Sequence, residues 1–125
     1  MSSIGSGPGR ALIAVYGLFS LAAGARAAVQ IATRFGEAPL AYSLSAFAAA
    51  VYVLLTVALW RGARRLALAA LLVELAGVLI IGTASLLDPA AFPDETVWSV
   101  YGKGYLFIPL VLPLAGLYWL RRQRR

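Results

Sequence analysis

The sequence predicts an all-α membrane protein in which four transmembrane helices form a single bundled domain. Of its 125 residues, 62% are hydrophobic and 13% are charged, whereas soluble proteins are roughly 45–50% apolar and about 25% charged. Four apolar runs follow one another, each close to the roughly 20 residues that a helix needs to cross a bilayer. The runs lack the alternation of a β-barrel, and a helix satisfies its backbone hydrogen bonds without help from lipid.

The four predicted spans cover residues 11–33, 39–60, 66–87 and 97–120. The first has an alternative interpretation, because Ala25-Arg26-Ala27 resembles the small-x-small cleavage site of a signal peptide. Apolar residues continue past this site as far as Ile31. We therefore expect the first span to be retained.

Arginine placement predicts the orientation of the chain. The loop after the second run and the end of the chain are rich in arginine, whereas the loop after the third run is acidic. The positive-inside rule then places both termini and the second loop in the cytoplasm, as an even number of spans allows. We expect a multi-pass protein of the inner (plasma) membrane, with anionic lipids at the arginine clusters. The clusters are Arg61, Arg64 and Arg65, and Arg121, Arg122, Arg124 and Arg125.

Missing residue types narrow the possible chemistry. The chain has no cysteine and no histidine, which removes the usual ligands of zinc, haem and iron–sulfur clusters. We expect no metal site and no cofactor. No nucleophile–base pair is visible, so an enzyme is not expected. The net charge of +6 follows from arginines placed by topology, and a nucleic-acid partner is not expected.

Glu74, near the middle of the third span, is the sharpest candidate site. At helical spacing, small residues such as Ala70 and Gly77 share its face, while leucines such as Leu72 and Leu79 occupy the opposite face. Small residues mark helix contacts in membranes, so Glu74 is predicted to face another helix. Two interpretations remain open: a proton- or cation-handling carboxylate, or a structural hydrogen bond that locks the bundle or a subunit interface.

Two further charges lie inside predicted spans. Arg26 precedes Gln30 and Thr33 on one polar strip, and it either pairs with Glu74, binds an anionic head group, or extends its side chain to the interface. Lys103, flanked by glycines and tyrosines, is either an interfacial anchor or a buried cation.

Two prolines stand four residues apart in the fourth span. Pro109 and Pro113 each lack an N–H, so helix kinks are predicted there. The kinks serve packing alone, form a hinge, or expose a carbonyl that lines a site.

The stretch VWSVYGKGYLFIPLVLPLAGLYWL at 97–120, together with AVYGLFSLAAGARAAVQIATRFGEAPLAYSLSA near the start, resembles small four-span integral membrane proteins of actinobacteria. The resemblance implies a four-span fold over most of the chain. That group has no assigned activity, so it implies no functional residue. Small multidrug transporters, with an essential glutamate in the first helix, and fluoride channels, which depend on asparagine, match less well.

From these observations we expect a non-enzymatic interaction or accessory subunit that packs against itself or a larger membrane complex. The alternative is a small proton- or ion-coupled carrier or channel that uses Glu74. Whether Glu74 faces a water-reachable cavity or a dry helix contact distinguishes the two.

Overall fold

The computed structural model describes residues 7–91, 98–105 and 107–122, and the regular structure of this part is helical throughout. Val97, Arg124 and Arg125, which belong to the predictions above, lie outside it. The long helices are α1 (Gly7–Arg34), α2 (Pro39–Arg61), α3 (Arg64–Leu87) and α4 (Ile108–Arg122). Three short 3-10 helices connect them: η1 (Phe35–Glu37), η2 (Pro89–Ala91) and η3 (Ser99–Tyr105). The predicted all-α class is confirmed.

Three of the described helices, α1 to α3, are long and apolar enough to cross a membrane. They have 28, 23 and 24 residues, and each contains one of the first three predicted spans. A helix of this length exceeds the thickness of a hydrocarbon core, which is about 30 Å. These three helices support a location in a membrane.

The turn between α2 and α3 is short because a glycine closes α2. Gly62 adopts the left-handed conformation, with φ 69°, which a glycine reaches at no steric cost. The N–H of Ala63 then bonds to the carbonyl of Ala58 at 2.9 Å, as at many helix C-termini. At the other end of α2, Pro39 is the first helical residue, where a missing N–H costs nothing.

The fourth predicted span is not one continuous helix among the described residues. Three residues of η3, Val100, Tyr101 and Gly102, have positive φ angles of 49°, 61° and 86°. Phe107 also has a positive φ, 61°, and α4 begins only at the next residue. With 15 residues, α4 rises about 22 Å, less than the roughly 30 Å of a hydrocarbon core.

A proline explains why α4 begins where it does. Pro109 is the second residue of α4, and the carbonyl of Phe107 accepts from the N–H groups of Leu110 and Val111, both at 3.1 Å. These two hydrogen bonds hold Phe107 at the start of the helix. Pro109 lies in the first turn, where its missing N–H interrupts no helical hydrogen bond. Pro109 also packs against Gly102, where a Cβ would come within 2.7 Å of the ring.

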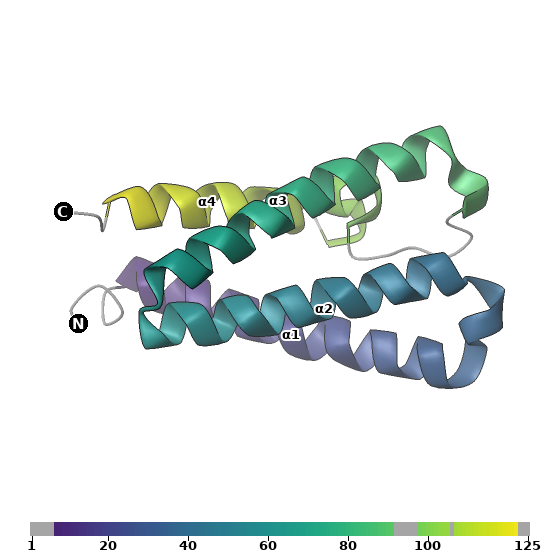
Figure 1. Ribbon diagram of the computed structural model, residues 1–125, viewed down its shortest axis with the longest axis horizontal. Helices are drawn as coiled ribbons and strands as arrows, with labels where there is room; N and C mark the ends of the chain where they lie inside the picture. The colour runs from purple at the N-terminus through teal and green to yellow at the C-terminus, as the bar shows by residue number, and fades with distance from the viewer. Residues whose placement is uncertain (1–6, 92–97, 106, 123–125) are drawn as a thin grey trace.

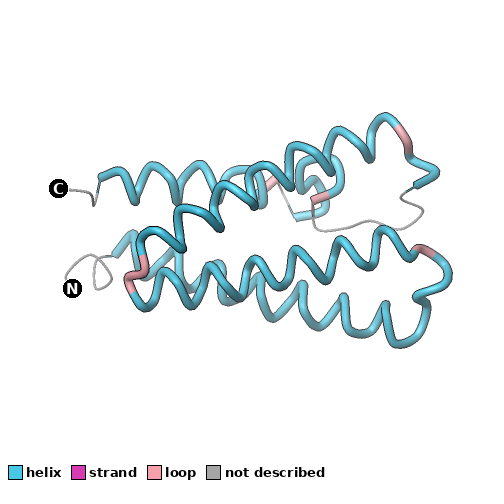
Figure 2. Tube along the Cα trace, viewed as in Figure 1, coloured by secondary structure: helices cyan, strands magenta, loops and turns pink. Residues whose placement is uncertain are grey.

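The helices form a bundle in which α4 and η3 share the fourth position end to end. Figure 1 shows α1 against α2, α3 diverging from α2, and α4 beside the first half of α3. The start of α1, the α2–α3 turn and the end of α4 lie at one end of the bundle. Beyond α4, η3 lies beside the second half of α3 (Figure 2).

Glycines mark the contacts along α3. A Cβ at Gly116 of α4 would lie 2.8 Å from Leu71 of α3, and one at Gly77 of α3 would lie 2.5 Å from the ring of Trp98, just before η3. Further along α3, Gly82 faces Tyr101 in the same way. These close approaches hold the two-part fourth segment against α3.

Candidate functional site

Glu74 lies inside the bundle and bonds to a tyrosine of α1. Its side chain is 0% exposed, as is that of Tyr16. The Tyr16 hydroxyl donates a hydrogen bond of 2.6 Å to Oε1 of Glu74. Leu72 and Leu79 on the opposite side of α3 are exposed, so the prediction that Glu74 occupies the packing face is confirmed.

The second carboxylate oxygen has a different environment. Oε2 of Glu74 is buried and accepts no hydrogen bond from the residues that the structure describes. A buried carboxylate oxygen without a partner is costly when the group is ionised, because water is not there to solvate it. The carboxyl group is therefore held at one oxygen only.

A second tyrosine extends this polar centre toward η3. Tyr52 of α2 is fully buried, and its ring centroid lies 6.0 Å from that of Tyr16. The indole N–H of Trp98 donates to the Tyr52 hydroxyl at 2.9 Å. Trp98 is 1% exposed. We call Tyr16, Tyr52, Glu74 and Trp98 the central cluster; it joins α1, α2, α3 and the segment before α4.

The sequence analysis did not identify Tyr16, Tyr52 and Trp98 as partners of Glu74. For the two tyrosines, the distance of each residue from the end of its helix could have indicated the contact. Tyr16 comes nine residues after the start of α1, and Glu74 ten residues after the start of α3. Tyr52 comes nine residues before the end of α2. These three helix ends lie at the same end of the bundle, so the three side chains share a level about 14 Å from it by helical rise.

Of the three interpretations of Arg26, pairing with Glu74 is not supported by the contacts of Glu74 among the described residues. Arg26 lies ten residues beyond Tyr16 on α1, about 15 Å further along by helical rise. Oε1 of Glu74 is taken by Tyr16, and Oε2 has no partner among the described residues. The spacing of polar residues along one helix shows which of them share a face. It does not show how far along a neighbouring helix each of them lies.

Arg26 instead lines a groove at the other end of α1. The groove has a volume of about 450 Å³ and is lined by Ala25, Arg26, Val29, Gln30 and Arg34. Thr33, expected on the same polar strip, is exposed and donates to the carbonyl of Val29 at 2.6 Å. Arg26 and Gln30, two of the three residues of the predicted polar strip, therefore line one groove, and Arg34 lines it as well.

Lys103 is exposed on η3. The neighbouring Tyr101 is anchored to α3, because its hydroxyl lies 2.8 Å from Oγ1 of Thr83. The buried-cation interpretation of Lys103 is therefore not supported, whereas its role as an interfacial anchor stays a prediction.

The two prolines occupy different positions in α4. Pro109 lies in the first turn, where no kink arises, but Pro113 lies inside the helix and both are buried. Pro113 cannot donate to the carbonyl of Pro109, four residues earlier, so a kink at Pro113 remains a prediction.

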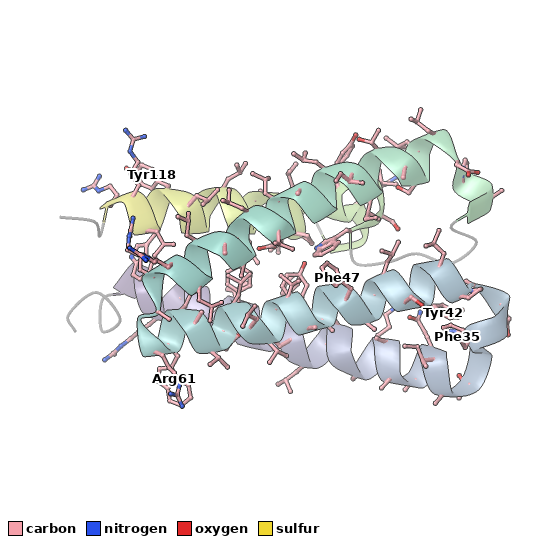
Figure 3. The ribbon with its side chains drawn as sticks, viewed as in Figure 1. Phe35, Tyr42, Phe47, Arg61 and Tyr118 are labelled. Atoms are coloured by element: carbon pink, nitrogen blue, oxygen red, sulfur yellow. The ribbon has the colours of Figure 1, made fainter. Side chains whose placement is uncertain are left out.

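Most of the arginines lie at the end of the bundle where α2 ends, α3 begins and α4 ends. Figure 3 shows Arg61 and Tyr118 at this end and Phe35 and Tyr42 at the opposite end. Arg64 donates to the carbonyl of Leu120 at 2.5 Å, which ties α3 to α4. Arg122 donates to the Tyr118 hydroxyl at 3.0 Å. Several arginines of this end remain exposed: Arg10, Arg61, Arg65, Arg121 and Arg122.

In comparisons with known proteins, no family model, no curated protein and no solved structure matches the chain.

Proposed function

We propose that this chain is a small integral membrane protein that acts without catalysis, as an interaction or accessory subunit within the bilayer. The observation that supports this function best is the dry contact around Glu74. Its carboxyl group is fully buried and bonded to Tyr16, as expected of a residue that locks helices together. A group that exchanges protons with water needs a path to water.

The central cluster supports the same function. Tyr52 receives the indole N–H of Trp98, and the edge of the Phe19 ring packs against Tyr52 with centroids 5.6 Å apart. Close van der Waals packing and hydrogen bonds hold helices together in lipid, where the hydrophobic effect is weak, and aromatic pairs add to this packing. Such a centre keeps a short chain in one shape and leaves its outer faces for contacts with other membrane proteins or with a second copy.

We further propose that α4 and η3 together complete a fourth crossing, with both termini in the cytoplasm of a cell whose plasma membrane holds the protein. The arginine-rich end carries Arg61, Arg64, Arg65, Arg121 and Arg122, which favours its retention on the cytoplasmic side. The opposite end holds the α1–α2 turn.

Purification from native membranes tests the proposed function. The tagged full chain is extracted in mild detergent, and the mass of the particle and the identities of its proteins are measured. We expect a particle of fixed composition, containing either a second copy or a stoichiometric membrane partner. A free single chain that moves protons after reconstitution would contradict the proposal.

A carrier that uses Glu74 is the second candidate function. The observation in its favour is Oε2 of Glu74, which is buried without a hydrogen-bond partner among the described residues and is therefore open to a proton or a cation. Proton flux of the wild type and of Glu74→Gln separates the two candidates, as described in the Discussion.

A further inference from the structure

The groove on α1 places two arginines and an amide on one side of a helix. Arg26, Gln30 and Arg34 are spaced four residues apart, so their side chains follow one another along the same face. Gln30 is 3% exposed, Arg26 is half-buried and Arg34 is exposed. The groove thus becomes more open from Arg26 toward the α1–α2 turn.

This groove borders the seam between α1 and α2, because Gln30 is 3% exposed and α2 is the helix that packs most closely on α1. Ser20 marks that seam, because its hydroxyl lies 3.2 Å from Oγ1 of Thr56 on α2. Arg26 follows Ser20 by six residues, which places it roughly 120° around the helix axis, on the other flank of the same seam. α4 packs mainly on α3 and touches α1 little.

The surface around the groove is apolar and open to lipid. Val29, in the groove wall, is 60% exposed, and Leu21, two turns nearer the middle of α1, is 74% exposed. Ala25, between them, is also exposed. An occupant of the groove therefore meets cations at one end and an apolar helix face at the other.

Charge identifies the polar part of the occupant. A guanidinium carries five N–H donors in a planar fork that fits two phosphate oxygens at once, so a contact within the protein does not exhaust it. Two guanidinium groups line the groove. The acidic residue nearest in sequence is Glu37, exposed on η1.

We propose that the groove lined by Arg26, Gln30 and Arg34 binds one anionic phospholipid, with the phosphate between the arginines and an acyl chain along Val29, Ala25 and Leu21. The occupant is a lipid and not free phosphate, because the apolar face continues directly from the cationic wall. The site lies at the opposite end of the bundle from the arginine clusters of α2, α3 and α4, and so in the other leaflet.

Lipid titration of the full-length protein tests this site. The purified chain in detergent is titrated with dioctanoyl phosphatidylglycerol, with dioctanoyl phosphatidylcholine and with inorganic phosphate, and bound molecules are counted by native mass spectrometry. We expect the tightest phosphatidylglycerol site to bind at least about tenfold better than phosphatidylcholine, and millimolar phosphate not to displace it.

Two variants locate the site, and a third controls for charge. Arg26→Gln and Arg34→Gln should each weaken the tightest phosphatidylglycerol site about tenfold, the scale of one lost charge-assisted contact. Arg34→Gln changes an exposed residue, so it tests the site even if Arg26→Gln fails to fold. Arg65→Gln removes the same charge from an exposed position at the other end and should leave the tightest site unchanged.

Three results would overturn the proposal. Equal weakening by Arg65→Gln means that lipid responds only to net charge. Displacement by inorganic phosphate means that the site holds an anion and not a lipid. Unchanged binding in Arg34→Gln means that the groove is not the site.

Discussion

The Tyr16 hydroxyl and the Glu74 carboxyl meet at 2.6 Å in the interior of the bundle, between two helices separated by 58 positions in the chain. Both side chains are inaccessible to solvent. One contact thus joins the first and third helices at the level where Tyr52 and Trp98 join α2 to the segment before α4. Removing it should affect the whole bundle.

Tyr16→Phe should destabilise the protein by about 1–3 kcal/mol, because it leaves both carboxyl oxygens of Glu74 buried without a partner. The free energy of unfolding is measured by titrating the protein from mild detergent into sodium dodecyl sulfate. Tyr118→Phe is the matched control: Tyr118 is 62% exposed, and its loss should change stability by less than about 0.5 kcal/mol. Equal effects of the two substitutions would show that the Tyr16 contact contributes nothing.

Gly77→Ala should destabilise the protein by about 1–3 kcal/mol through overpacking, because the new Cβ would lie 2.5 Å from the buried indole ring of Trp98. Gly24→Ala is the control, since a Cβ there meets nothing within 4 Å. Alanine is the better helix former, so Gly24→Ala should be neutral or slightly stabilising in the same assay. A stable Gly77→Ala protein would mean that Trp98 does not rest on α3.

Glu74→Gln should fold and assemble like the wild type, because the amide keeps the shape of the carboxyl group and an oxygen that accepts from Tyr16. We expect neither protein to move protons, measured as dye-reported pH change in vesicles under a membrane potential. Glu74→Ala should weaken assembly by about 0.6–2 kcal/mol without preventing insertion. Proton flux in the wild type that disappears in Glu74→Gln would make the protein a carrier.

Cysteine labelling tests the proposed orientation, and the absence of native cysteines makes single sites unambiguous. Glu37 and Arg65 are both exposed and lie at opposite ends of the bundle. In intact cells, Glu37→Cys should react with a membrane-impermeant thiol reagent, whereas Arg65→Cys should react only after lysis. The reverse pattern would invert the proposed topology.

The sequence alone predicted the parts of the fold that depend on length and periodicity. The first three helices match their expected spans because apolar run length decides where a helix crosses lipid. The burial of Glu74 was predicted because small residues accompany it on one face of α3. These properties belong to single helices and need no knowledge of neighbours.

The parts that sequence did not predict depend on contacts between segments. An apolar run at 97–120 suggested one helix, but Val100 and Tyr101 adopt left-handed conformations that non-glycine residues, and β-branched valine above all, rarely adopt. Tertiary contacts hold them there: the N–H of Val100 donates to Oγ of Ser85 at 2.8 Å. The contact between Tyr16 and Glu74 was missed because finding it requires a comparison of how far each residue lies from the same end of the bundle.

If α4 and η3 complete a fourth crossing as proposed, the division of this segment into two pieces sets the order in which the helices enter the membrane. During synthesis, α4 is too short to remain across the bilayer by itself, and the non-helical backbone of η3 would face lipid with unsatisfied N–H groups. Ser85 satisfies one of them, and it belongs to α3. We therefore expect the first three helices to insert before η3 and α4 dock, and a mutation in α3 that blocks docking to expose the undocked segment to membrane quality-control proteases.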